Sequence, residues 1–110
     1  MLYMIVERFR DGDAKPVYVR FRERGRLAPP GLTYVSSWVD DELRICFQLM
    51  EAGDRALIDE WIANWRDLVS FEVYPVIESA EAARRVLGEE PPLTANSTEL
   101  GPNRVEGTDS

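Results

Sequence analysis

The sequence of 110 residues contains no histidine and a single cysteine, Cys46. Histidine is the usual proton-transfer group near neutral pH and a common metal ligand, so its absence excludes Ser-His-Asp and Cys-His catalysis and argues against zinc or copper sites. One cysteine excludes an intrachain disulfide and is typical of a reducing compartment. We therefore expect a cytoplasmic protein that uses no metal and no other cofactor.

Long apolar runs are also missing. No stretch of about 18 apolar residues occurs, so we expect no transmembrane helix. The first ten residues, MLYMIVERFR, lack the basic start and the long apolar run of a signal peptide, so we expect no secretion signal. The formal net charge of −7 argues against nucleic acid and anionic membranes as partners.

Residues 43–78 contain the clearest pattern, which predicts a strand, a helix and a second strand. In the helix, apolar residues recur at helical spacing. They are Leu57, Ile58, Trp61, Ile62, Trp65 and Leu68. Asp54 is expected to cap this helix, because a carboxylate accepts hydrogen bonds from the free backbone N–H groups of a first turn. The flanking segments 43–50 and 71–78 alternate at period two, which predicts strands that bury one face.

The residues before this region predict a strand over residues 2–9, a helix from an N-cap at Asp13 to about Leu27, and a strand over residues 32–39. Pro16 fits the first turn of that helix, where a missing N–H costs nothing. The acidic segment 40–42 is expected to form a hairpin turn between the strand at 32–39 and the strand at 43–50.

At the other end of the chain, Ser79 is expected to start a short helix that ends at Gly88. The last 22 residues contain five acidic residues and one arginine, and they show no apolar periodicity. We therefore expect one domain over residues 1–88 and an acidic tail over residues 89–110 that is disordered or is ordered only against a partner subunit.

The predicted order of elements is βαββαβ with a further C-terminal helix. This order favours an α+β, ferredoxin-like fold with an antiparallel sheet in the strand order 4-1-3-2 and two helices on one face. Pro75 agrees with this topology, because proline is tolerated in an edge strand and the fourth strand lies at an edge.

The alternation assigns the residues of the sheet to two faces. We expect the helices to cover the more apolar set, which is Leu2, Met4, Val6, Val35, Ile45, Phe47, Leu49, Phe71 and Val73. The open face would then carry Tyr3, Ile5, Glu7, Tyr34, Trp38, Cys46, Gln48, Met50, Glu72 and Tyr74. That face is too aromatic to stand in water and too polar for a dry core. We therefore expect a homodimer, packed sheet against sheet, that encloses a partly polar cavity.

Three segments of the sequence resemble the DUF3303 family, small bacterial proteins of unknown function. These segments are MLYMIVERFRDGDAKPVYVRFRERGR, LTYVSSWVDDELRICFQLME and LIDEWIANWRDLVSFEVYPV, and the resemblance spans roughly residues 1–80. It implies a dimeric α+β barrel, whose relatives include cofactor-free monooxygenases and small-molecule-binding or stress-related domains. It implies no catalytic residues, because none is established for the family.

The candidate ligand-binding residues are the polar and aromatic members of the predicted open face. They are Glu7, Tyr34, Trp38, Cys46, Gln48, Glu72 and Tyr74. Glu7 and Glu72 would lie on neighbouring strands, where two carboxylates either perform acid–base chemistry or pair with arginines. Cys46 is either a nucleophile or a small buried apolar residue. The three rings either form a wall for a planar ligand or pack in an interface.

These expectations leave three functions open. The first is a homodimer that binds a small aromatic or amphipathic molecule in a cavity on the open sheet face. The second is an interaction or regulatory module whose sheet face is filled by its own side chains. The third is a cofactor-free, monooxygenase-like enzyme, which rests on analogy of fold alone.

Overall fold

The computed structural model describes residues 1–88, so the predicted tail over residues 89–110 lies outside the described part of the chain. Residues 1–76 form one compact unit, and a second unit begins at Ile77. The elements are β1 (Leu2–Phe9), the 3-10 turn η1 (Arg10–Gly12), α1 (Lys15–Arg24), β2 (Leu32–Val39), β3 (Ile45–Ala52), α2 (Arg55–Ala63), β4 (Val69–Val76) and α3 (Ser79–Leu87). Within residues 1–88 no helix combines the length and the apolar character needed to cross a membrane.

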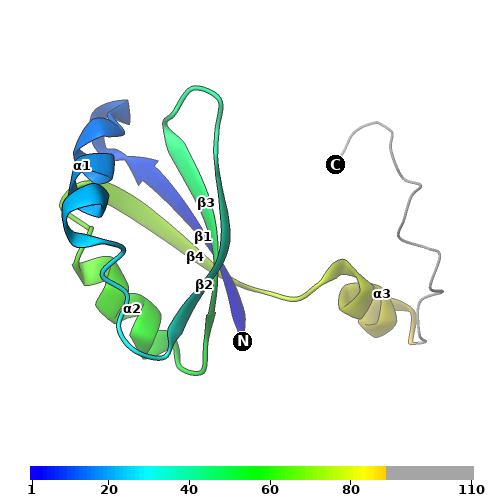
Figure 1. Cartoon of the computed structure of the whole chain (residues 1–110). Coiled ribbons are helices and arrows are strands. Elements are labelled where there is room, and N and C mark those ends of the chain that lie inside the picture. Colours follow the sequence, from blue (N-terminus) through cyan, green and yellow to red (C-terminus); the bar gives the residue numbers. More distant parts are fainter. Residues whose placement is uncertain (89–110) are drawn as a thin grey trace. The chain divides into compact units, whose positions relative to one another are not determined.

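The four strands form one antiparallel sheet in the order β2-β3-β1-β4. Both α1 and α2 lie on the same face of this sheet (Figure 1). The predicted ferredoxin-like α+β fold and the strand order 4-1-3-2 are therefore confirmed. Pro75 lies in β4, at an edge, where its missing N–H removes no bond from the centre of the sheet.

The prediction of which residues the helices cover is wrong for the two central strands. The side chains buried beneath α1 and α2 include Tyr3, Ile5, Glu7 and Phe9 of β1 and Gln48 and Met50 of β3. Phe71 of β4 also lies beneath the helices, where its ring contacts that of Trp61 at a centroid distance of 5.7 Å. Because Phe71 pairs directly with Glu7, the sheet register places Glu7 on the same, helix-covered face.

A β-bulge in β2 changes the face of the residues that follow it. Tyr34 pairs with Met50 and Ser36 with Leu49, so Val35 is the extra residue in this strand. Before the bulge, Tyr34 lies on the helix-covered face. After the bulge, Trp38 pairs with Phe47 and lies on the opposite face. Perfect alternation along residues 32–39, which the sequence suggested, does not occur.

The ends of α1 and α2 shape the loops above the sheet. The Asp54 carboxylate accepts a hydrogen bond from the Ala56 N–H at 2.9 Å, which confirms the predicted N-cap of α2. Helix α2 ends at Ala63, so Trp65 lies in the turn that leads to β4. Helix α1 ends three residues earlier than predicted, because Gly25 takes a positive φ of 75°.

Helix α1 has no fully buried residue, and polar contacts help to hold it against the rest of the unit. Arg20 donates two hydrogen bonds to the carboxylate of Asp67, at 2.8 and 2.7 Å, and a third to the Asn64 carbonyl at 2.9 Å. Its guanidinium also lies 5.5 Å from the centre of the Trp65 ring. These contacts join α1 to the segment after α2 and fix the space between the two helices and the sheet.

Candidate functional site

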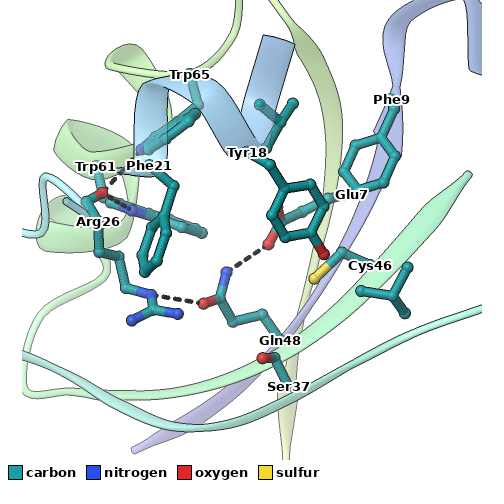
Figure 2. Close-up of a pocket in the computed structure, with 12 residues that line it drawn as sticks. Glu7, Phe9, Tyr18, Phe21, Arg26, Ser37, Cys46, Gln48, Trp61 and Trp65 are labelled. Carbon is teal, nitrogen blue, oxygen red and sulfur yellow. Dashed lines mark hydrogen bonds between the residues drawn. The ribbon is translucent and has the colours of Figure 1, made fainter. Parts of the chain in front are cut away.

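A pocket of about 120 Å³ lies between the sheet and the helices α1 and α2. Its walls are mainly aromatic and come from five different segments of the chain (Figure 2). The rings belong to Phe9, Tyr18, Phe21, Trp61 and Trp65. Both tryptophans are buried, whereas Tyr18 and Phe21 remain about half exposed. The pocket is therefore an apolar space with a rim that solvent reaches.

A chain of two hydrogen bonds crosses the floor of the pocket (Figure 2). Arg26 Nε donates to Gln48 Oε1 at 2.9 Å, and Gln48 Nε2 donates to Glu7 Oε2 at 2.6 Å. Because a guanidinium can only donate, Arg26 requires the amide oxygen of Gln48 to face it. The amide NH₂ must then face Glu7, so Oε2 of Glu7 acts as an acceptor. Any proton on Glu7 consequently belongs on its other oxygen.

Glu7 is the unusual group of this pocket, since only 6% of its surface is exposed. Burial raises the pKa of Glu7 to about 7, while the hydrogen bond from Gln48 and the charge of Arg26 oppose the rise. Gln48 is its only hydrogen-bond partner among residues 1–88. A buried carboxyl group with a pKa near 7 can accept or donate a proton at neutral pH, so the site could support acid–base chemistry.

Two other titratable groups line the pocket, and both keep their protons at neutral pH. Burial, followed by the charge of Glu7, raises the pKa of the Cys46 thiol to about 12. Burial also raises the pKa of Tyr18, and Cys46 and Glu7 add to the effect. A thiol with so high a pKa is a poor nucleophile, which favours the interpretation of Cys46 as a small buried residue.

The loop that carries Arg26 is held in place by α2 and the turn that follows it. The indole N–H groups of Trp61 and Trp65 both donate to the Arg26 carbonyl oxygen, at 3.0 and 2.9 Å. Asn64 Nδ2 donates to the carbonyl oxygen of Leu27 at 3.1 Å. Leu27 has a positive φ of 63°, a conformation that costs energy in a residue other than glycine and persists only where surrounding contacts enforce it.

The side chain of Arg26 is held as firmly as its backbone. Its guanidinium carbon lies 3.8 Å from the centre of the Tyr34 ring and 5.2 Å from that of Phe21. Contact with ring faces stabilises a cation without using its N–H groups. Tyr34 is fixed in turn by a hydrogen bond of 2.8 Å between its hydroxyl and that of Ser37. The orientation of Arg26 is thus set before any ligand arrives.

The structure divides the seven residues predicted from the sequence between the two faces of the sheet. Glu7, Cys46 and Gln48 line the pocket, and Tyr34 supports it through Arg26. The remaining three, Trp38, Glu72 and Tyr74, lie on the opposite face. The prediction that all seven share one face is therefore wrong, and so is the pairing of Glu7 with Glu72 in one cavity. Their role in ligand binding stays a prediction.

Several pocket residues were missed in the sequence. Arg26 falls within the helix predicted to end at about Leu27, although its position after Gly25 is a signal that it leaves the helix. Trp61 and Trp65 belong to the apolar set of the predicted helix, which accounts for their burial but not for their hydrogen bonds to the Arg26 carbonyl.

The opposite face of the sheet bears large apolar side chains that no element of residues 1–76 covers. Val35, Trp38, Phe47 and Tyr74 belong to the strands outside the pocket and are 37–54% exposed. Three side chains of this face contact one another. Arg8 contacts Glu72 at 3.1 Å, and the Tyr74 hydroxyl donates to the same carboxylate at 3.3 Å.

In residues 1–88 no three cysteine, aspartate or glutamate side chains gather closely enough to hold a metal ion. A family model described as a domain of unknown function, DUF3303, matches residues 1–89. No curated protein and no solved structure matches the chain. The match covers most of the chain and includes every residue of the pocket. The chain belongs to the DUF3303 family.

Proposed function

We propose that the pocket between the sheet and the two helices binds a small aromatic or amphipathic molecule. The observation that carries this proposal is Glu7, a buried carboxyl group with a single hydrogen-bond partner among residues 1–88, set among aromatic rings. A buried polar group with unused hydrogen-bonding capacity costs stability, and a ligand that satisfies it offsets this cost.

The size of the pocket limits the ligand to about one ring. A cavity of about 150 Å³ accommodates benzene, and pockets for drug-sized molecules have roughly 300–1,000 Å³. With about 120 Å³, this pocket has room for a single ring or a short branched chain. A larger ligand would have to leave its remaining part at the rim, beside Tyr18 and Phe21.

The three tryptophans provide the test of this proposal, because each indole N–H gives its own signal in a ¹H–¹⁵N NMR spectrum. Titration with benzyl alcohol, a neutral single-ring probe, is expected to shift the Trp61 and Trp65 signals, since both rings line the pocket. The Trp38 signal should stay in place because that ring lies on the other face of the sheet. Native mass spectrometry of the freshly purified full chain would reveal any ligand that co-purifies.

A matched pair of substitutions in β2 strengthens this experiment. Val39→Phe adds a ring at the wall of the pocket and is expected to abolish the shifts. Val35→Phe makes the same change at an exposed position outside the pocket and should leave them intact. Shifts at Trp38 alone, or shifts that survive Val39→Phe unchanged, would place the ligand elsewhere and contradict the proposal.

We also propose that a second copy of the chain packs on the open face of the sheet. Support comes from the exposed apolar side chains of that face, because monomers rarely leave contiguous apolar patches of several hundred Å² in water. The charged groups Arg8 and Glu72 on the face pair with each other, so their burial would leave neither charge without a partner. A sheet face that packs on its own copy forms a closed two-fold dimer.

Sedimentation velocity of the full chain at micromolar concentration tests the dimer. Phe47→Lys is expected to raise the dissociation constant at least about tenfold, because it brings a charge into an apolar interface. Phe21→Lys is the matched control, since Phe21 is a similarly exposed ring on the helix side. A wild-type protein that sediments only as single chains, or an equal effect of both substitutions, would rule out this interface.

A further inference from the structure

Among residues 1–88, Arg26 is the one cation that lines the pocket, and most of its hydrogen-bonding capacity is unused. Its Nε donates to Gln48, but neither terminal nitrogen has a hydrogen-bond or ion-pair partner among residues 1–88. A guanidinium presents five N–H donors in a planar fork that matches the two oxygens of a carboxylate. Arg20, by contrast, already uses that fork to bind both oxygens of the Asp67 carboxylate.

We propose that the ligand of this pocket is a small organic anion of the carboxylate class, whose ring lies among the aromatic side chains and whose charged group binds the terminal nitrogens of Arg26. This inference rests on the proposed function, because it names the chemical class of the molecule that the same pocket binds. It adds that the charge of the ligand, and not its apolar part alone, determines which molecules bind.

The surroundings of Arg26 support an anionic ligand. The rings of Tyr34 and Phe21 and the amide of Gln48 hold the guanidinium in one orientation, and the indoles of Trp61 and Trp65 hold its backbone. A preorganised cation loses little entropy when it binds its partner. The last turn of α1 adds exposed basic residues, Arg22 and Arg24, which would attract anions toward the rim even though the whole chain is acidic.

Glu7 couples this binding to pH. The charged or titratable groups that face it are Arg26, Tyr18 and Cys46, together with the neutral amide of Gln48. Of these groups only Glu7 changes its charge between pH 6 and 8. Below pH 7 Glu7 is mostly neutral and the pocket has a net positive charge. Above pH 7 the ionised Glu7 opposes Arg26, so an anion should bind more weakly.

Three single-ring probes of different charge test the inference: benzoate, benzyl alcohol and benzylamine. With the Trp61 and Trp65 signals as the readout, we expect benzoate to bind at least about tenfold more tightly than the other two at pH 6. Its affinity should fall several-fold between pH 6 and 8 in the wild-type protein and stay constant in Glu7→Gln. Benzoate remains ionised throughout this range, so the probe does not contribute to the change.

Variants at residue 26 connect the preference to the guanidinium. Arg26→Gln is expected to remove the advantage of benzoate over benzyl alcohol, and Arg26→Lys to retain part of it, because lysine keeps the charge without the fork. Arg24→Gln changes the net charge by the same amount at an exposed position and should lower the affinity for benzoate less than threefold. Neither change at residue 26 removes the backbone carbonyl that the two indoles contact.

The outcomes separate this inference from the proposed function. If none of the three probes shifts the Trp61 and Trp65 signals, the pocket does not bind ring-sized molecules and both proposals fail. If all three bind equally, if benzylamine binds most tightly, or if Arg24→Gln costs as much as Arg26→Gln, the pocket binds rings but the inferred preference for an anion is wrong. The charge series of probes on the wild-type protein decides the matter even if a variant does not fold.

Discussion

Replacing Trp61 with alanine is expected to lower the free energy of unfolding by about 3–5 kcal/mol. Trp61 is 2% exposed and belongs to the main core cluster, where its ring meets that of Phe71 edge to face. The substitution would also remove the hydrogen bond from its indole N–H to the Arg26 carbonyl. Core packing and the position of the pocket loop both depend on the Trp61 side chain. The loss of stability in Trp61→Ala should therefore exceed the loss caused by truncating an ordinary buried apolar residue.

Urea unfolding followed by circular dichroism measures this loss, and Trp61→Phe separates its two causes. Phenylalanine keeps an aromatic ring in the core but cannot donate to the Arg26 carbonyl, which retains its bond from Trp65. We expect Trp61→Phe to cost about 1–2 kcal/mol. A loss below about 1 kcal/mol for Trp61→Ala would show that this wall of the pocket is not part of the stabilising core.

The second large effect is a gain of stability. Glu7→Gln is expected to stabilise the protein by about 3 kcal/mol at pH 8 and to change its stability little at pH 4.5. The reason is the rise of the Glu7 pKa from the ordinary 4.5 to about 7, which burial causes. Glutamine has nearly the same shape and its amide oxygen can still accept the hydrogen bond from Gln48, but it never carries a buried charge.

The direction of the pH dependence follows from where the proton is held. Between about pH 4.5 and 7 the folded protein keeps a proton on Glu7 that the unfolded chain has released. Because of Glu7, the stability of the wild-type protein therefore falls as pH rises from about 4.5 to 7. Above pH 7 Glu7 causes no further change in stability. In Glu7→Gln this contribution is absent, so the difference between the two proteins should grow from about pH 4.5 and level off above pH 7.

Glu72→Gln is the matched control for this experiment. Glu72 lies on the neighbouring strand but on the opposite face, and its ion pair with Arg8 is half exposed. Loss of this ion pair should change stability by less than about 1 kcal/mol at pH 8. If Glu7→Gln is instead less stable than the wild-type protein at pH 8, then Arg26 and Gln48 compensate the buried charge more fully than its burial suggests.

The topology of this domain could be predicted from local signals. Helical periodicity around Trp61 and the capping residue Asp54 located α2, and two βαβ units leave few right-handed arrangements of four strands. Pro75 supported the position of β4 at an edge. Each of these signals depends on residues that are close together in the sequence, so it can be recognised without knowledge of the tertiary structure.

The faces of the central strands could not be predicted in the same way. In β1 and β3 each of the two alternating sets contains several apolar residues, and the helices cover the less apolar set, which includes Glu7 and Gln48. The more apolar set was the natural choice for the core, but it lies on the open face. Polar residues are tolerated beneath the helices because they hydrogen-bond to each other and to Arg26. That compensation depends on tertiary contacts that alternation does not reveal.

The candidate site was recognised only in part for the same reason. Glu7, Cys46 and Gln48 were selected correctly as neighbours, because they alternate on two adjacent strands. The prediction that Trp38 lies on the same face as these residues is wrong, since an even spacing from Tyr34 implies the same face only in a strand without a bulge. Arg26 was missed because its side chain reaches the pocket from a loop whose path is set by Trp61, Trp65 and Asn64.

The extra residue at Val35 lets one short strand serve two surfaces with separate requirements. Tyr34 supports the cation of the pocket from one side of the sheet, and Trp38 presents its ring on the other. In a regular strand these residues, four positions apart, would lie on the same surface. Because the β-bulge at Val35 separates them, substitutions in the second half of β2 can alter the outer surface while Tyr34 stays unchanged. The proposed ligand specificity and the proposed assembly can therefore diverge independently among relatives of this chain.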